Sequence, residues 1–228
     1  MLLQSSSLAA VVLSSIVLVG YLAPVTEAHS WLECVNWQFH NPDKKDWSDK
    51  GGECLGYARR FPLGHKFASM DSSPARHYQQ DNKNPNNALP CSDGDQGEEP
   101  GMDETLAEPR DAAYNRKGWG KMTVTKVGDE ICLRWPAKTH GNEDSVVMVA
   151  ISKNANGKDP TQKGFNSNIV AKLKFGNCSG SGGKDNTACG GCFPVPVRAS
   201  GDYVLQWRWE LNEDEFYTSC ADLRIGSK

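Results

Sequence analysis

The stretch Lys121-Met-Thr-Val-Thr-Lys-Val-Gly-Asp-Glu-Ile-Cys-Leu-Arg-Trp135 gives the clearest indication of the fold. Apolar and polar residues alternate from Lys121 to Val127, and the alternation continues from Glu130 to Trp135. The pair between them, Gly128-Asp129, is typical of a turn. This stretch therefore predicts two strands separated by a turn.

Further strand signals follow toward the C-terminus. They are an apolar run at 145–152, an alternating run at 169–175, a run at 203–210 after a Gly201-Asp202 turn, and a final run at 218–225. By contrast, residues 38–118 are rich in Gly, Pro, Asn and Asp, and their helical signals are weak, with one short helix expected at 104–114. Short strands separated by turns predict an all-β, antiparallel β-sandwich. We expect its long loops to be stapled by disulfides.

Residues 1–28 predict a secretory signal peptide. The run from Leu8 to Val19 is mostly apolar or small, no charge precedes Glu27, and the segment ends at Ala28 with a residue that signal peptidase accepts. The usual basic residue near the start is missing, and the apolar run is short for a membrane span. We expect cleavage after Ala28, secretion without a membrane anchor, and a single mature domain at 29–228.

The charge balance argues against nucleic acid as a partner. The sequence has 25 basic and 28 acidic residues, and loss of Glu27 with the leader brings the net charge of the mature chain to about −2. Nucleic-acid and anionic-membrane partners favour a strongly basic surface. The 200 residues from 29 to 228 can bury the core of one domain, and we expect a monomer.

Eight cysteines, all in the mature part, predict four disulfides, although eight cysteines allow 105 pairings. Cys34, Cys54 and Cys91 are expected to staple the loop-rich half. Cys189-Gly-Gly-Cys192 has the spacing of a redox or zinc motif, but structural bridging is the better interpretation in an exported protein. The sequon at Asn177 indicates only a surface position in a secreted chain.

Cleavage after Ala28 would make His29 the amino-terminal residue. Its α-amino group and imidazole could then chelate one metal ion, provided that both nitrogens are unprotonated. Copper competes well for such nitrogen ligands. The alternative is that a histidine merely happens to follow the cleavage site, so the remaining ligands have to come from the rest of the chain.

Two later segments supply candidates. His140 follows the predicted strand at 130–135, where it is either a second ligand or a solvated loop residue. Tyr217 and Glu215 lie two residues apart and therefore share one face of a strand. A tyrosine in this place is by default a packing residue with a solvated hydroxyl. The five histidines of the chain include no His-x-x-x-His pair, which argues against a helical zinc-protease site.

Together these residues resemble the lytic polysaccharide monooxygenases. That family has a mature N-terminal histidine, a second histidine after a core strand, and a late Tyr-x-x-Cys-Ala segment, and the matching residues here are His29, His140 and Tyr217 to Ala221. The opening residues 29–34, the cysteine-rich body and Trp207-Arg-Trp209 most resemble the oomycete group, auxiliary activity family seventeen. The resemblance covers nearly all of 29–228 and implies an immunoglobulin- or fibronectin-like sandwich. One departure is Glu215, where many relatives have Gln.

The resemblance implies one copper ion per chain, held by three nitrogens from His29 and His140, with Tyr217 in the axial position. It also implies an external electron donor with O2 or H2O2 as co-substrate, and oxidation of a C–H bond at the glycosidic carbon. Glu215 would direct a hydrogen bond near the metal. Trp207 and Trp209 share a strand face. They are interpreted as core residues, or as a conduit for stray oxidising equivalents, rather than as a sugar-binding platform.

Pectin is the expected substrate, because members of this group cleave it. Homogalacturonan is a polyanion, and basic pairs at Lys44-Lys45, Arg59-Arg60 and Arg116-Lys117 could bind it, although loop charges are often merely solvated. Cellulose and chitin remain alternatives, because exposed aromatics usually contact such flat chains. The candidates for that contact are Trp31, Trp37, Trp47 and Tyr57.

Two other functional classes remain open. A non-catalytic secreted copper-binding protein would use the same histidines but lack the axial tyrosine, so Tyr217 argues against it. A disulfide-rich interaction protein or carbohydrate-binding module would make His29 accidental. A glycoside hydrolase would need two carboxylates at a set separation, which the sequence alone does not reveal.

Overall fold

The structure is a computed structural model, and it describes residues 30–58, 79–81, 90–91, 122–137, 144–156, 159–179, 187–212 and 215–227. The elements within these ranges are nearly all strands. They are β1 (Trp37–Gln38), β2 (Glu53–Cys54), β3 (Gln79–Asp81), β4 (Thr123–Lys126), β5 (Glu130–Ala137), β6 (Val146–Ile151), α2 (Gln162–Asn166), β7 (Ile169–Lys174), β8 (Thr187–Pro194), β9 (Gly201–Asn212) and β10 (Glu215–Gly226).

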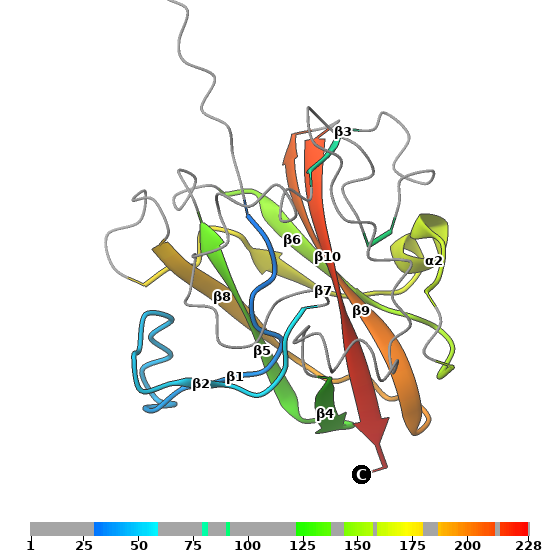
Figure 1. Cartoon of the computed structure of the whole chain (residues 1–228), viewed down its shortest axis with the longest axis horizontal. Helices are drawn as coiled ribbons and strands as arrows, with labels where there is room; N and C mark the ends of the chain where they lie inside the picture. Colours follow the sequence, from blue (N-terminus) through cyan, green and yellow to red (C-terminus); the bar gives the residue numbers. More distant parts are fainter. Residues whose placement is uncertain are drawn as a thin grey trace, which may run out of the picture.

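Two sheets pack face to face. The larger has the order β3-β10-β9-β6-β7, the smaller is the β5-β8 pair, and Figure 1 shows the second lying across the first. All of these neighbours are antiparallel, whereas β4 pairs with β10 in parallel. The all-β, antiparallel sandwich predicted from the alternating runs is confirmed, with β4 as the exception to the antiparallel pattern.

The core lies between the two sheets and is rich in tryptophan. Trp135 of β5 and Trp207 and Trp209 of β9 are fully buried, and they pack with Phe175, which follows β7. Phe175 stacks on Trp209 with ring centroids 3.8 Å apart. Trp207 and Trp209 are therefore core residues, which rules them out as a sugar platform.

The outer face of β9 is also buried. Gln206 points away from the main core and exchanges hydrogen bonds of 2.7 and 3.0 Å with Gln162 of α2. It also donates to the carbonyl of Pro90, beside the Cys91–Cys220 disulfide. The Gln206 side chain is thus satisfied by α2 and by the carbonyl of Pro90, as a buried amide requires.

All eight cysteines are paired, as predicted. Cys34–Cys54 closes the β1–β2 region, and Cys91–Cys220 ties the loop-rich half to β10, which confirms the expected stapling. Cys192 pairs with Cys132 of β5, while Cys189 pairs with Cys178. The two cysteines of the Cys-x-x-Cys motif therefore have separate structural partners. The list of bridges is Cys34–Cys54, Cys91–Cys220, Cys132–Cys192 and Cys178–Cys189.

Strands β1, β2, β3 and β8 and helix α2 were not predicted. Strand β8 contains Gly190-Gly191, which reads as a turn, yet both glycines are needed for close packing. A β-carbon at Gly190 would lie 2.3 Å from Trp47 Cζ3, and one at Gly191 would lie 2.9 Å from Leu173 Cδ1. Helix α2 is capped by Thr161, whose hydroxyl accepts from the Gly164 N–H at 3.2 Å. The helix expected at 104–114 lies outside the described residues.

No helix in the described ranges has the length and apolar character that a membrane crossing would need.

Candidate metal centre

The two predicted nitrogen ligands, His29 and His140, lie outside the described residues, but their neighbours in the chain are placed. Ser30, the first described residue, is buried, and its hydroxyl donates to the carbonyl of Pro136 at 2.7 Å. Pro136 lies one residue before the end of β5, on the segment that leads to His140. The chain next to one predicted ligand is therefore bonded to the chain leading to the other.

The segment after Ser30 runs antiparallel to β5. Cys34 pairs with Arg134, and the backbone hydrogen bonds between them measure 3.1 Å and 2.9 Å. On its other side, the N–H of Leu32 donates to the hydroxyl of Ser219 at 3.2 Å. The N-terminal segment thus lies between β5 and β10, which belong to different sheets.

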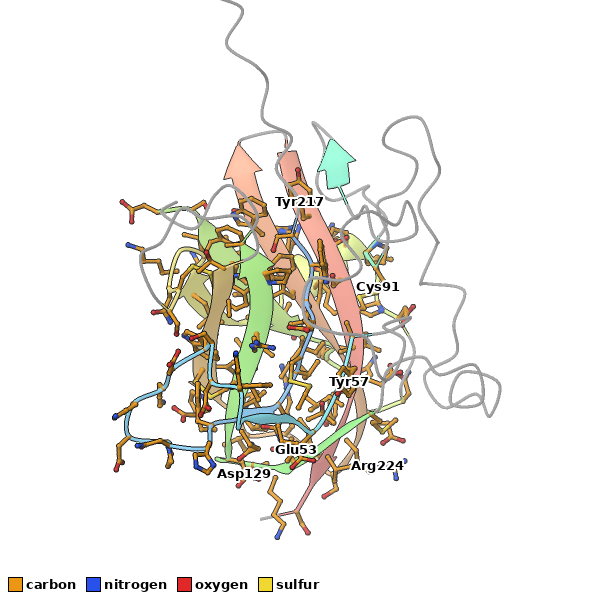
Figure 2. All side chains as sticks on the ribbon, turned by 60° about the vertical axis from the view of Figure 1, so that its left-hand side comes forward. Glu53, Tyr57, Cys91, Asp129, Tyr217 and Arg224 are labelled. Carbon is orange, nitrogen blue, oxygen red and sulfur yellow. A yellow bond between two sulfur atoms is a disulfide. The ribbon has the colours of Figure 1, made fainter. Side chains whose placement is uncertain are left out.

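Tyr217 lies near the start of β10 at the same end of the sandwich. Figure 2 shows it at the end opposite Asp129 and Arg224, and the first described residues, the end of β5 and the start of β10 all lie in the upper part of Figure 1. Tyr217 is opposite Trp209 in the β9–β10 register, and their rings stack at 5.0 Å. Only 2% of Tyr217 is exposed, so it is a packed core aromatic. Its axial role stays a prediction.

Glu215 is the first residue of β10, where it pairs with Asn212 of β9 and Asp81 of β3. Its side chain lies outside the described part of the structure, so its role near the metal also stays a prediction. The backbone nevertheless places Glu215 at the same end of the large sheet as Tyr217.

A buried charged pair joins the N-terminal segment to β5. The guanidinium of Arg134 donates to the carboxylate of Glu33 at 3.0 Å, and both side chains are about nine-tenths buried or more. Burial raises the pKa of Glu33 to about 7, because desolvation of the carboxylate outweighs the attraction of the Arg134 charge. Burial also lowers the pKa of Arg134. This pair was not recognised in the sequence, where Glu33 is one acidic residue among 28.

We expect Glu33 to make the fold less stable as the pH rises from about 4.5 to about 7. A carboxyl group whose pKa is raised by folding stabilises the folded state below its unfolded pKa, and that contribution is lost as the pH rises through the folded pKa. The loss is on the order of 3 kcal/mol at most. Urea unfolding of the wild type and of Glu33→Gln across this range measures it. Equal pH slopes in the two proteins would contradict the expectation.

One other group of potential metal ligands lies among the described residues, but its cysteines are not free to bind an ion as thiolates. Glu130, Cys132 and Cys192 bring their ligand atoms together, but the two sulfurs form a disulfide. A half-open cavity of about 370 Å³ lies elsewhere, between the end of β6 and α2. Most of its lining residues are of polar types, with Asn154, Asp159 and Thr161 among them, and none is a predicted site residue.

The basic pair Lys44-Lys45 lies away from the end of β5 that leads to His140. Lys45 forms an ion pair of 2.9 Å with Glu130, the first residue of β5. Seven residue steps separate Glu130 from Ala137, which amounts to about 23 Å along a strand. Lys44-Lys45 therefore lies near the opposite end of β5. The pairs Arg59-Arg60 and Arg116-Lys117 lie outside the described residues.

Three of the four aromatic candidates for a flat sugar-binding face are buried, which rules them out, whereas Tyr57 is partly exposed and stays a candidate. Trp31, Trp37 and Trp47 are 1%, 7% and 4% exposed, and Tyr57 is only partly exposed. The ring of Trp37 lies under the guanidinium of Arg134 at 4.2 Å, and that of Trp47 packs against Gly190. Trp37 and Trp47 therefore pack the 30–58 region against the β5–β8 pair. Their burial cannot be deduced from the sequence alone.

Comparisons with known proteins were made for both sequence and structure. No family model and no curated protein matches the chain. Solved structures with a similar arrangement include an AA10 lytic polysaccharide monooxygenase from Streptomyces lividans, at 16% identity, with 70% of this chain and 88% of that chain covered and a TM-score of 0.47.

Two others are the cellulose-active lytic polysaccharide monooxygenase CelS2 in complex with copper and a chitin binding domain from Burkholderia pseudomallei. The first is 19% identical, covers 71% of this chain and 83% of its own, and has a TM-score of 0.45. The second is 14% identical, covers 88% and 100%, and has a TM-score of 0.49. At these identities the likeness assigns no activity to this chain.

Proposed function

We propose that this chain is a secreted, copper-dependent polysaccharide monooxygenase whose metal is held by His29 and His140. The observation that carries the proposal is the hydrogen bond from Ser30 to the carbonyl of Pro136, together with that from Leu32 to Ser219. Through these bonds, the residue after His29, the strand before His140 and the strand that carries Tyr217 meet at one end of the sandwich. Four disulfides support an oxidising, extracellular location.

Chain connectivity allows the two histidines to meet. His29 is one residue from Ser30, or about 3.8 Å between Cα atoms, and His140 is three residues beyond Ala137, or at most about 11 Å. Cys34 pairs with Arg134, so an antiparallel register that continued would place His29 opposite Thr139, next to His140. We therefore expect their nitrogens to be able to bind one ion together.

The donor set fits copper. Two neutral imidazoles and one neutral α-amino group are nitrogen ligands that hold Cu(II) well, and all must be unprotonated to bind. When bound, copper would supply one-electron redox chemistry with an external electron donor and O2 or H2O2. His29 and His140 would hold the ion, the packed ring of Tyr217 would limit access on one side, and Glu215 would orient a hydrogen bond from outside the ligand set. Consumption of peroxide driven by ascorbate tests for an enzyme, because a copper-binding protein without activity would show none.

Replacing Tyr217 with Phe is expected to keep most of the copper affinity while changing the electron paramagnetic resonance spectrum and the rate of inactivation under turnover. The ring stays stacked on Trp209, so only the hydroxyl is lost. Because the ring is retained, stability should change by no more than about 1 kcal/mol. An unchanged spectrum and an unchanged inactivation rate would mean that Tyr217 is a packing residue alone.

The proposed substrate is de-esterified homogalacturonan, and this rests on the resemblance to the pectin-active group. If Arg59 and Arg60 bind the polyanion, the contacts join exposed charges and are screened within roughly 8 Å at physiological ionic strength. Cleavage should then fall as salt rises, whereas peroxide consumption without polymer should not. Arg59→Ala/Arg60→Ala should mimic the salt effect.

The matched control is Lys44→Ala/Lys45→Ala, because Lys45 pairs with Glu130 at the opposite end of β5. It should leave pectin cleavage unchanged. Mass spectrometry of digests is the readout, and oxidised oligogalacturonides should appear only with reductant and copper. Oxidised cello- or chito-oligosaccharides, with nothing from pectin, would remove the substrate assignment and leave the copper chemistry in place.

A further inference from the structure

Arg134 is a buried hub between β5 and the N-terminal segment. It donates to Glu33 at 3.0 Å and to the carbonyl of Trp47 at 2.9 Å, and its guanidinium lies 4.2 Å from the centre of the Trp37 ring. Three residues of the 30–58 region thus contact one side chain of β5. Glu33 and Arg134 are 5% and 9% exposed, so the pair is shielded from solvent.

Backbone pairing alone does not define how this segment lies on β5. The N–H groups of Glu33 and Cys34 both donate to the carbonyl of Arg134, but backbone bonds by themselves do not specify which residues pair, so the register depends on side chains. A slip of two residues keeps the same side chains facing the sheet and moves the segment by about 7 Å. The Cys34–Cys54 disulfide joins the segment to β2, so it does not set the register on β5.

We propose that Arg134, acting through Glu33 and Trp37, is a positioning residue that fixes the register of the N-terminal segment on β5 and thereby presents the amino terminus to the metal. The proposal rests on the function proposed above. Glu33 lies four residues after His29, and Arg134 lies six before His140, so one contact relates the two ligand-bearing segments. An apolar pair of similar size would commonly be at least as stable, which is why a role in specificity is the better account of a buried charged pair.

The decisive variant is Glu33→Leu/Arg134→Met. It replaces the pair with apolar side chains and leaves no buried charge, so the fold should persist. In the metal-free protein, hydrogen exchange at the amides of Glu33 and Cys34 should become at least about tenfold faster, while exchange in β9 and β10 stays unchanged. Unchanged exchange at these two amides would overturn the proposal.

The copper-loaded protein supplies the second readout. The double variant should show more than one copper species by electron paramagnetic resonance and a copper affinity about tenfold weaker. Glu33→Gln keeps an oxygen that accepts from Arg134, so it should retain the wild-type spectrum. The control Arg224→Gln breaks the Arg224–Asp202 pair at the far end of β10 and should also match the wild type.

Faster exchange with a single, unaltered copper spectrum would overturn the positioning role. A wild-type chain that binds no copper would overturn the proposed function instead. In that case the exchange measurement still decides whether Arg134 fixes the register of the segment.

Discussion

Replacing His140 with Ala should weaken Cu(II) binding by roughly 100-fold or more, which is about 2.8 kcal/mol of binding free energy. Only the two donors of His29 would remain, and a chelate of two nitrogens holds the ion less tightly than three. The fold should be unaffected, because His140 lies beyond the end of β5 at Ala137. Isothermal calorimetry with copper measures the affinity directly.

His40 provides the matched control for this experiment. Its backbone N–H donates to the Asp49 side chain in the exposed region between β1 and β2, and the residue itself is exposed. His40→Ala removes one histidine from the chain but none from the predicted site, so its copper affinity should equal that of the wild type. An unchanged affinity in His140→Ala would remove His140 from the site.

Replacing Trp209 with Ala should destabilise the protein by roughly 3–5 kcal/mol. Trp209 is fully buried and stacks with two aromatic rings, Phe175 at 3.8 Å and Tyr217 at 5.0 Å between ring centroids. Its indole N–H also donates to the hydroxyl of Ser145 at 2.7 Å. The substitution therefore leaves a cavity and removes a hydrogen bond. Urea unfolding should show a lower midpoint.

Val124→Ala is the control for this loss, because 67% of Val124 is exposed and its truncation should cost no more than about 0.5 kcal/mol. The Trp209→Ala cavity also adjoins Tyr217, so the copper spectrum should change with the stability. A stability loss below about 1 kcal/mol would show that the ring stack can close over the gap, and that the core is less tightly packed than the ring distances indicate.

The sandwich could be predicted because its main strands alternate. Apolar and polar residues alternate in the sequences of β4, β5 and β7, and this period is visible without a structure, even though the structure buries both faces of β5. Strand β8 could not be predicted, because Gly190 and Gly191 are small to accommodate Trp47 and Leu173, which come from distant parts of the chain. The same distance in sequence hides the burial of Trp31, Trp37 and Trp47.

The candidate site could be predicted only in part. His29 is predicted from its place after the expected cleavage site, and Tyr217 from the segment around Cys220. The supporting contacts could not be predicted, because Ser30 with Pro136 and Glu33 with Arg134 are more than 100 residues apart in the chain. Neither the disulfide pattern nor the hub at Arg134 follows from local sequence, since both depend on how the two sheets meet.

The central claim is that the free amino terminus of His29 binds copper together with His140. The most direct test is a copper titration of two chains, one beginning at His29 and one carrying a single additional alanine before it. The added residue removes the α-amino group from His29 and leaves every described contact in place. The account predicts one tightly bound copper ion in the first chain and a loss of tight binding in the second. Equal stoichiometry and affinity in both chains would contradict it.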